Sequence, residues 1–276
     1  MPVLGTGEAC IVVRAMQEFG ITPSEIVGEV VESRVIGVVS VPFSEVSPQE
    51  LCWTLDLCVV SGYRPIEVAE RLSDLIASKV YDLEAKQVAS LMRSLAKLGC
   101  ISLDAVLEGG MVQQTLSVQR SLRPVDMSNI LWAFAELRIK PAAVLVAVLT
   151  QKAIQWRGLY EAPDIANTLW AYAELNLAPS PKVIVKAMQS KQHMVTGEGG
   201  GFDNRPGEDV AAALKAITEM MGSMVLGLTE RALLIADTFE PAELSLTMLS
   251  LARMRVLPDA TVVQVLSERA EVLAPR

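Results

Sequence analysis

Apolar positions along this chain recur with the period of an α-helix, and the blocks they form repeat at a nearly constant interval. Two blocks match at seven of nine positions: residues 129–137 read Asn-Ile-Leu-Trp-Ala-Phe-Ala-Glu-Leu, and residues 167–175 read Asn-Thr-Leu-Trp-Ala-Tyr-Ala-Glu-Leu. A proline follows each block, Pro141 or Pro179. The offset between the blocks is about 38 residues, an interval typical of helical repeat proteins.

The block occurs seven times with varying clarity, and the residue after its last apolar position serves as the register mark of each repeat. Successive marks lie about 34 to 45 residues apart. Positions seven, four and one before each mark are mostly apolar, which places them on one face of a helix. The residue five before the mark is small in six repeats, so neighbouring helix backbones can approach closely. The register marks are Gly20, Gly62, Gly99, Arg138, Asn176, Met221 and Arg255.

Prolines divide each repeat into two helices. In five repeats a proline stands at the third position after the mark. In five a proline precedes the mark by roughly four helical turns, with an acid within the next two positions. Proline is favoured in the first turn of a helix, and an early acid interacts with the positive end of the helix dipole. The first helix of a repeat is therefore predicted to start near Pro48, Pro124, Pro163, Pro206 and Pro241, and the second near Pro23, Pro65, Pro141, Pro179 and Pro258.

Seven helix pairs that bury their stripes on one another predict an all-α fold, an α-solenoid of about seven helix–turn–helix repeats of roughly 38 residues. Without a break between repeats, we expect residues 1–276 to form a single solenoid domain. Only Val35–Val41 is β-like, and it fits a loop or the extension of a helix. The stripe residues that we expect to be deeply buried are Leu131, Phe134, Leu137, Leu169, Tyr172 and Leu175.

A glycine-rich insertion near residues 196–206 interrupts the fifth interval between register marks, from Asn176 to Met221. A phosphate-binding loop would follow a strand and carry a lysine beside Ser or Thr. This stretch follows a predicted helix and carries Glu198 and Asp203. A surface loop is therefore favoured over a nucleotide site.

Composition argues against a membrane span and against catalysis. Hydrophobic residues make up 51% of the chain, yet apolar runs such as Ala142–Leu149 are far shorter than the roughly 18–20 residues of a spanning helix. The single histidine, His193, leaves no base to pair with a nucleophile. Cys52 and Cys58 are six apart, about 240° around a helix, so buried apolar thiols are favoured over a metal site. We expect no enzyme activity, no cofactor and no metal.

Repeated aromatic and amide side chains are candidates for contacts with nucleic-acid bases. Trp132 and Trp170 occupy the same repeat position, where base stacking and packing between helices are both consistent with the sequence. Asn129 and Asn167 share a slot that is polar only in some repeats. They fit base readout in a modular RNA reader or a local polar contact.

The formal net charge of −8 opposes binding along a phosphate backbone, because such binding depends on Lys and Arg displacing counterions. A local patch is compatible with that charge. We therefore predict any RNA contact at phosphates, without base specificity, provided that the edges carrying the cations meet. The densest basic region comprises Arg120, Arg123, Arg138, Lys140, Lys152 and Arg157.

Blocks such as Asn-Thr-Leu-Trp-Ala-Tyr-Ala-Glu-Leu, with a period near 38 and a proline opening the second helix, resemble the octotricopeptide and heptatricopeptide repeat proteins. These belong with the FAST-kinase-like and RAP-associated helical repeats of organellar proteins. The resemblance implies an α-solenoid in mitochondria, or alternatively in chloroplasts. It implies a scaffold subunit of a ribonucleoprotein, in particular of a mitochondrial ribosome, that contacts rRNA and neighbouring proteins. The alternative is a protein–protein adaptor of another organellar complex without RNA contact.

Overall fold

The computed structural model of the protein describes residues 5–20, 25–64, 69–99, 106–177 and 206–274. These residues form helices joined by short connections, and no strand occurs among them. They fall into two compact units, an N-terminal unit of Met1–Pro141 and a C-terminal unit of Ala142–Arg276. The predicted all-α class is confirmed, while the single solenoid domain over residues 1–276 stays a prediction.

Six helices end one or two residues before a register mark, and we call them first helices. They are α1 (Thr6–Glu18), α3 (Pro48–Ser61), α5 (Ala85–Leu98), α7 (Pro124–Glu136), α9 (Ala162–Glu174) and α12 (Pro241–Arg253). The others are second helices: α2 (Glu25–Ser40), α4 (Ala69–Lys79), α6 (Val112–Ser117, preceded by a π-helical segment Val106–Met111), α8 (Ala143–Trp156), α11 (Pro206–Leu234) and α13 (Ala260–Leu273).

Each first helix stops because the residue at the register mark turns the backbone into the left-handed region. Gly20, Gly62 and Gly99 have φ of 68°, 73° and 67°, as is common for glycine after a helix C-terminus. The other three marks adopt the same conformation with φ of 51° to 57° although they carry side chains; these are Arg138, Asn176 and Arg255. No other described residue has a left-handed φ. Six of the seven register marks read from the sequence are thus helix stops.

The starts of the first helices carry the predicted signals. At the start of α3, the Ser47 hydroxyl accepts a hydrogen bond from the backbone N–H of Glu50. At later helix starts, a carboxylate accepts a hydrogen bond from the backbone N–H three residues before it, as Asp126 and Glu243 do. The five predicted first-helix prolines all lie in the first turn of a helix, and Pro141 and Pro258 lie two residues before α8 and α13. The remaining three, Pro23, Pro65 and Pro179, lie outside the described residues.

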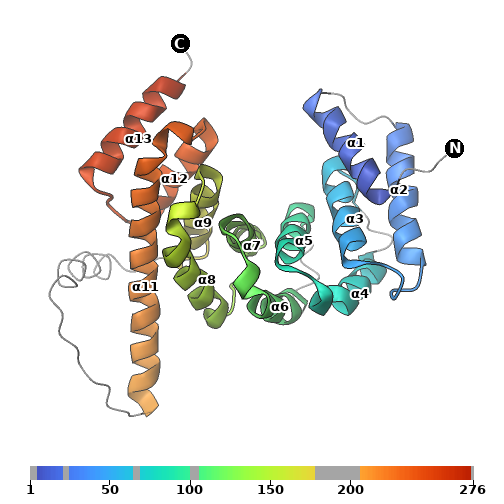
Figure 1. Cartoon of the computed structure of the whole chain (residues 1–276), viewed down its shortest axis with the longest axis horizontal. Coiled ribbons are helices and arrows are strands. Elements are labelled where there is room, and N and C mark those ends of the chain that lie inside the picture. The colour runs from blue at the N-terminus through green and yellow to red at the C-terminus, as the bar shows by residue number, and fades with distance from the viewer. Residues whose placement is uncertain (1–4, 21–24, 65–68, 100–105, 178–205, 275–276) are drawn as a thin grey trace. The chain divides into compact units, whose positions relative to one another are not determined.

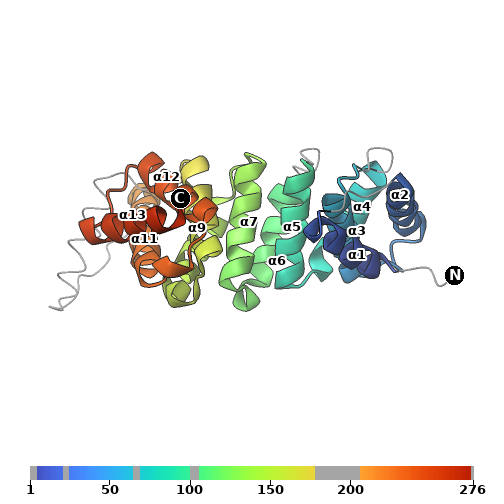
Figure 2. The same cartoon turned by 90° about the horizontal axis from the view of Figure 1, so that it is seen from above.

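Within each unit the helices pack neighbour to neighbour. In the N-terminal unit α1 packs on α3, α3 on α5 and α5 on α7, while α2 contacts both α3 and α4 (Figure 1). Figure 2 shows α5 and α7 side by side from above. In the C-terminal unit α9 packs on α12, and α11 packs on α8 and α13. The stripes lie at these contacts, since Leu131, Phe134, Leu169 and Tyr172 are at most 1% exposed. Leu137 is buried and Leu175 is half-buried.

A buried apolar residue sixteen before the mark fixes the entry into most first helices. Leu83, Leu122, Tyr160 and Phe239 each follow a short 3₁₀ turn, are extended, and are at most 1% exposed. In three of these cases, a side chain of the next second helix donates a hydrogen bond to the backbone carbonyl of the anchor residue. Gln114 Nε2 donates to Leu83 at 2.5 Å, Arg231 Nε to Tyr160 at 3.1 Å, and Arg269 to Phe239 at 3.0 Å.

The predicted sixth helix pair is wrong, because α11 runs without a break from Pro206 to Leu234, through the expected stop at Met221. Met221 itself is not glycine and is not followed three residues later by proline, and the helix continues through the adjacent Gly222. The bond from Arg231 to Tyr160 shows that α11 serves as the second helix after α9. The interval from Asn176 to Arg255 therefore holds one repeat of ordinary length and about 40 additional residues.

Two further predictions concern single segments. The β-like run Val35–Val41 is helical as far as Ser40, where it extends α2, one of the two options that the sequence left open. The glycine-rich insertion near residues 196–206 lies almost wholly outside the described residues and stays a prediction.

Candidate nucleic-acid interface

A groove of about 460 Å³ crosses the exposed faces of α1, α3, α5 and α7 in the N-terminal unit. We call it the basic groove. The first helices position its side chains, because their stripes face the neighbouring helices and leave the opposite faces to solvent. Two carboxylates line it, Asp56 and Asp126, against five cations: Arg14, Lys86, Arg93, Lys97 and Arg123.

The charge of the groove is opposite to that of the unit that contains it. Residues 1–141 include 12 Lys and Arg and 17 Asp and Glu, a net charge of −5. The groove alone has five cations and two acids, a net charge of +3. Cations are thus gathered on one face of an acidic unit, which is the local patch that the net charge of −8 left possible.

Both acids of the groove are already engaged. Asp56 forms an ion pair with Arg14 at 3.5 Å and accepts a hydrogen bond from Ser94 Oγ at 2.7 Å. Asp126 caps α7 and pairs with Arg123 Nε at 3.1 Å. The other three cations, Lys86, Arg93 and Lys97, form no ion pair with another residue of the described part. Their charge is available to an anionic ligand.

Arg93 is held in place by two residues of the neighbouring helix. Its Nη1 donates a hydrogen bond of 2.5 Å to Asn129 Oδ1, and its guanidinium lies 5.7 Å from the centre of the Trp132 ring. A guanidinium carries five N–H donors, so most remain for a ligand. Its orientation is nevertheless fixed by an aromatic ring and a hydrogen bond from α7.

Lys97 lies close to two other cations in the groove. Partial burial, together with the charges of Arg93 and Arg14, lowers the pKa of Lys97, and Asp56 counteracts this in part. The groove therefore concentrates positive charge at a cost to the free protein, and an anion would relieve that repulsion.

The predicted basic patch is divided among several places. Arg123 lines the basic groove, and Arg120 lies exposed in the 3₁₀ turn just before α7. Arg138 and Lys140 lie beyond the other end of α7, a helix of 13 residues and therefore about 20 Å long. The N-terminal unit thus carries two basic pairs at opposite ends of one helix rather than one edge.

The remaining two cations of the predicted patch belong to the C-terminal unit. Lys152 Nζ lies 4.7 Å from the centre of the Trp156 ring. Arg157 donates to the Ile154 carbonyl at 3.0 Å, and its side chain packs so closely on Gly227 that an added Cβ there would lie 2.9 Å from Cδ. Both side chains are therefore occupied in local packing.

The candidates for base contact are placed differently from each other. Asn129 lines the basic groove and holds Arg93, which is the local polar contact that the sequence allowed. Its counterpart Asn167 is half-buried on α9 in the C-terminal unit. Trp132 and Trp170 are both half-buried. Asn129 and Trp132 thus belong to the groove at least as supports of its central arginine.

Sequence reasoning missed Arg14, Lys86, Arg93 and Lys97, because it searched for cations close together along the chain. A signal was present in the register: Arg14 and Arg93 occupy the same position, six before the mark, as Trp132 does. Residues at one repeat position of successive first helices lie in one row across the face of the unit. Comparing this position across the first four repeats gives Arg14, Asp56, Arg93 and Trp132, and would have found two of the four missed cations.

Two further features of the described residues bear on metal binding and on the reactivity of the Cys52 thiol. Among them there is no group of three or more His, Cys, Asp or Glu side chains that could hold a metal ion. Burial raises the pKa of the Cys52 thiol to about 12, with a smaller contribution from Asp56, so it stays protonated. His193 and Cys100 lie outside the described residues. In the part searched, none of the helices combines the length and the apolar character required to cross a membrane.

Comparison of the chain with models of known protein families and with curated protein sequences finds no match.

Proposed function

We propose that the protein is an α-solenoid scaffold subunit of an organellar ribonucleoprotein and that its basic groove holds RNA phosphates. The observation that carries the proposal is the groove itself, where five cations from α1, α5 and the start of α7 line one surface of an acidic unit. Three of them have no ion-pair partner in the described structure, which is the arrangement that phosphate contacts require.

The resemblance to octotricopeptide and heptatricopeptide repeats supports the cellular setting. The left-handed residue at six of the seven marks supports a helical repeat, with six helix pairs among the described residues. We place the protein in mitochondria, with a mitochondrial ribosome as the assembly that fits the resemblance best. We propose no enzyme activity and no cofactor.

Salt titration of RNA binding tests the proposal. The probe is a fluorescently labelled oligouridine, and the protein is the full chain. With at most five phosphate contacts, the logarithm of the association constant should fall with the logarithm of salt concentration with a slope of about −3.5 or shallower. We expect no nanomolar affinity at physiological salt, because the net charge of −8 repels the rest of the strand.

Three substitutions combined, Lys86→Ala, Arg93→Ala and Lys97→Ala, should weaken binding at least about tenfold and reduce the slope by about 2. The matched control is Arg138→Ala with Lys140→Ala, which removes two exposed cations at the other end of α7 and should change little. Equal losses in both variants would mean that attraction is diffuse and that the groove is not the site.

The second candidate is a protein–protein adaptor, in which the same groove binds an acidic protein segment. The acidic net charge of the chain favours this alternative. Purification of the protein from organelles with and without RNase separates the two. Partners that stay bound after RNase, together with undetectable oligouridine binding, would establish the adaptor.

A further inference from the structure

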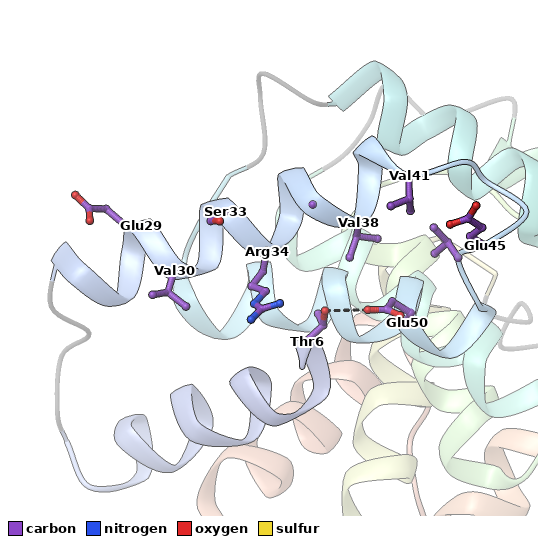
Figure 3. A pocket seen from close by; sticks show the side chains of 11 residues that line it. Thr6, Glu29, Val30, Ser33, Arg34, Val38, Val41, Glu45 and Glu50 are labelled. Atoms are coloured by element: carbon purple, nitrogen blue, oxygen red, sulfur yellow. Dashed lines mark hydrogen bonds between the residues drawn. The ribbon is translucent and has the colours of Figure 1, made fainter. Parts of the chain in front are cut away.

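A second hollow of about 600 Å³ lies between α1, α2 and the start of α3. We call it the terminal groove. Figure 3 shows α2 above and α1 below, with Arg34 pointing from α2 across the hollow toward Thr6 and Glu50. Thr6 Oγ1 donates to Glu50 Oε1 at 3.0 Å and closes the floor. The groove does not overlap the basic groove, because the two share no lining residue.

The next repeat shows what fills such a hollow. There α2, a second helix, packs against both α3 and α4, the first and second helices of the following repeat. The terminal groove lies between α1 and α2, the first and second helices of the preceding repeat. Among the described residues, no helix occupies the equivalent place on α1 and α2.

An arginine of α4 contacts the last turn of α2, the helix that fills the place one repeat later. Arg71 of α4 donates to the backbone carbonyl of Val39 in the last turn of α2, and its guanidinium lies 5.5 Å from the centre of the Phe43 ring. Arg34 of α2 precedes the next mark, Gly62, by the same interval as Arg71 of α4 precedes Gly99. Within the described structure Arg34 has no ion pair. Its position is that of a cap for the C-terminal carbonyls of one more helix.

The residues that line the terminal groove indicate what kind of helix could bind there. Val30 and Val41 are 46% and 37% exposed in the groove, so a helix seated there would bury apolar surface. Three glutamates line the groove against the single Arg34; they are Glu29, Glu45 and Glu50. This surface is complementary to a helix with an apolar stripe flanked by Lys or Arg. The C-terminal turn of that helix would lie toward Arg34.

We propose that the terminal groove is a docking site for a basic amphipathic helix of a partner protein, seated as α2 is seated on α3 and α4. A second copy of this chain fits less well. Its last helix, α13, ends in a stretch with Glu268 and Glu271, which would meet the glutamates of the groove.

The probe is a labelled peptide with the sequence of residues 25–43, which is the helix and following turn that fill the equivalent place one repeat later. In it Glu25→Lys, Glu29→Lys and Glu32→Lys supply the basic flanks, and the unsubstituted peptide is the matched control. We expect the basic peptide to bind the full chain saturably and the acidic one at least about tenfold more weakly.

Variants of the full chain test the contacts. Arg34→Ala and Val30→Lys should each weaken binding of the basic peptide at least about tenfold, while Lys215→Ala, which removes an exposed lysine that lines neither groove, should not change it. Circular dichroism checks that each variant is folded, and oligouridine binding should be the same in all three. The last readout separates failure of this proposal from failure of the proposed RNA function.

Two results would overturn the proposal. The first is an absence of saturation at about 1 mM peptide, or equal binding by the Arg34→Ala and wild-type chains. The second is self-association of the chain in sedimentation that Val30→Lys abolishes, which would make a second copy the occupant.

Discussion

At the scale of single residues, three side chains adopt a backbone conformation usually reserved for glycine. Arg138, Asn176 and Arg255 end their helices with φ between 51° and 57°. Left-handed backbone is unfavourable for residues with a Cβ, least so for asparagine. The sequence identifies these positions because the apolar stripe of each helix ends there. The glycines at the three equivalent marks show that a left-handed backbone is required at this position.

Substitution of Arg138 by glycine should therefore stabilise the protein. We expect the free energy of unfolding to rise by about 0.5–1 kcal/mol, because the strain of a side chain at positive φ exceeds the entropy that glycine loses. Chemical denaturation measures the change. The reciprocal variant, Gly62→Ala, should be destabilised by about 1 kcal/mol; a gain there would show that strain at the marks is negligible.

Leu169 lies at the centre of the stripe of α9 and is fully buried. Leu169→Ala should lower the free energy of unfolding by about 2–5 kcal/mol, as large-to-small changes in packed cores do. The exposed Leu257, at 85% exposure, provides the control. A loss under about 1 kcal/mol for Leu169→Ala would contradict the packing of α9 on α12.

Lys97 should show a conflict between stability and binding. Its pKa is lowered by burial and by Arg93, so its charged form is disfavoured in the folded protein. The sign follows from linkage: deprotonation is easier in the folded state, so this unfavourable contribution is present at neutral pH and disappears as pH rises through the pKa of Lys97. Lys97→Met should leave stability unchanged or raise it by about 0.5 kcal/mol, while weakening oligouridine binding.

Parallel denaturation and binding measurements at neutral pH test this pair of effects. Lys140→Met, which removes an exposed lysine away from Arg93, should change neither quantity appreciably. A destabilised Lys97→Met variant would mean that the ammonium makes a favourable contact in the folded protein.

At the scale of helices, local signals were sufficient for the first helices and insufficient for α11. Caps, early acids and stripes act within one or two turns, so they could be read directly from the sequence. The break expected at Met221 rested on stripe spacing alone, since the mark is not glycine and no proline stands three residues after it. The residue sixteen before it is Arg205, where other repeats have a buried apolar anchor such as Leu83 or Phe239. The absence of an apolar residue at this position is a sequence signal that the segment before Met221 is not an ordinary repeat.

The bond from Arg231 to Tyr160 ties α11 to the start of α9, and its loss should be measurable. Arg231→Ala leaves the carbonyl of a fully buried residue without its donor. We expect a loss of about 1.5–3 kcal/mol, the range for hydrogen bonds to charged groups. Arg253→Ala is the control, since it removes a surface ion pair with Glu174 worth about 0–1 kcal/mol. Similar losses for both would mean that α11 is not anchored there.

At the scale of the whole molecule, the sequence predicted the class of fold but not the candidate site. The class follows from periodicity, which every repeat expresses. The basic groove depends on cations from the first, third and fourth repeats, which are spread along the sequence from Arg14 to Arg123. Their proximity results from the packing of α1, α3, α5 and α7, so a search for neighbouring charges in the sequence could not find it.

The additional residues between α9 and α12 should be tolerant of shortening. Deletion of Gly197–Gly201 is expected to change the free energy of unfolding by less than about 0.5 kcal/mol, because the entropy of closing a loop depends only logarithmically on its length. Thermal and chemical denaturation of the deletion variant measure this. Unfolding of the variant would show that the glycine-rich stretch packs inside the protein.

The pairing of α9 with α12 also sets an order of events during synthesis. Arg93 and Asn129, which join α5 to α7, are 36 residues apart, whereas Glu174 and Arg253, which join α9 to α12, are 79 apart. At about 5–20 residues per second, a ribosome makes the partner of α5 within about 2–7 s and the partner of α9 only after about 4–16 s. The apolar stripe of α9 therefore waits about twice as long for its cover. In the nascent chain, this is the stretch where chaperone binding and aggregation compete longest with folding.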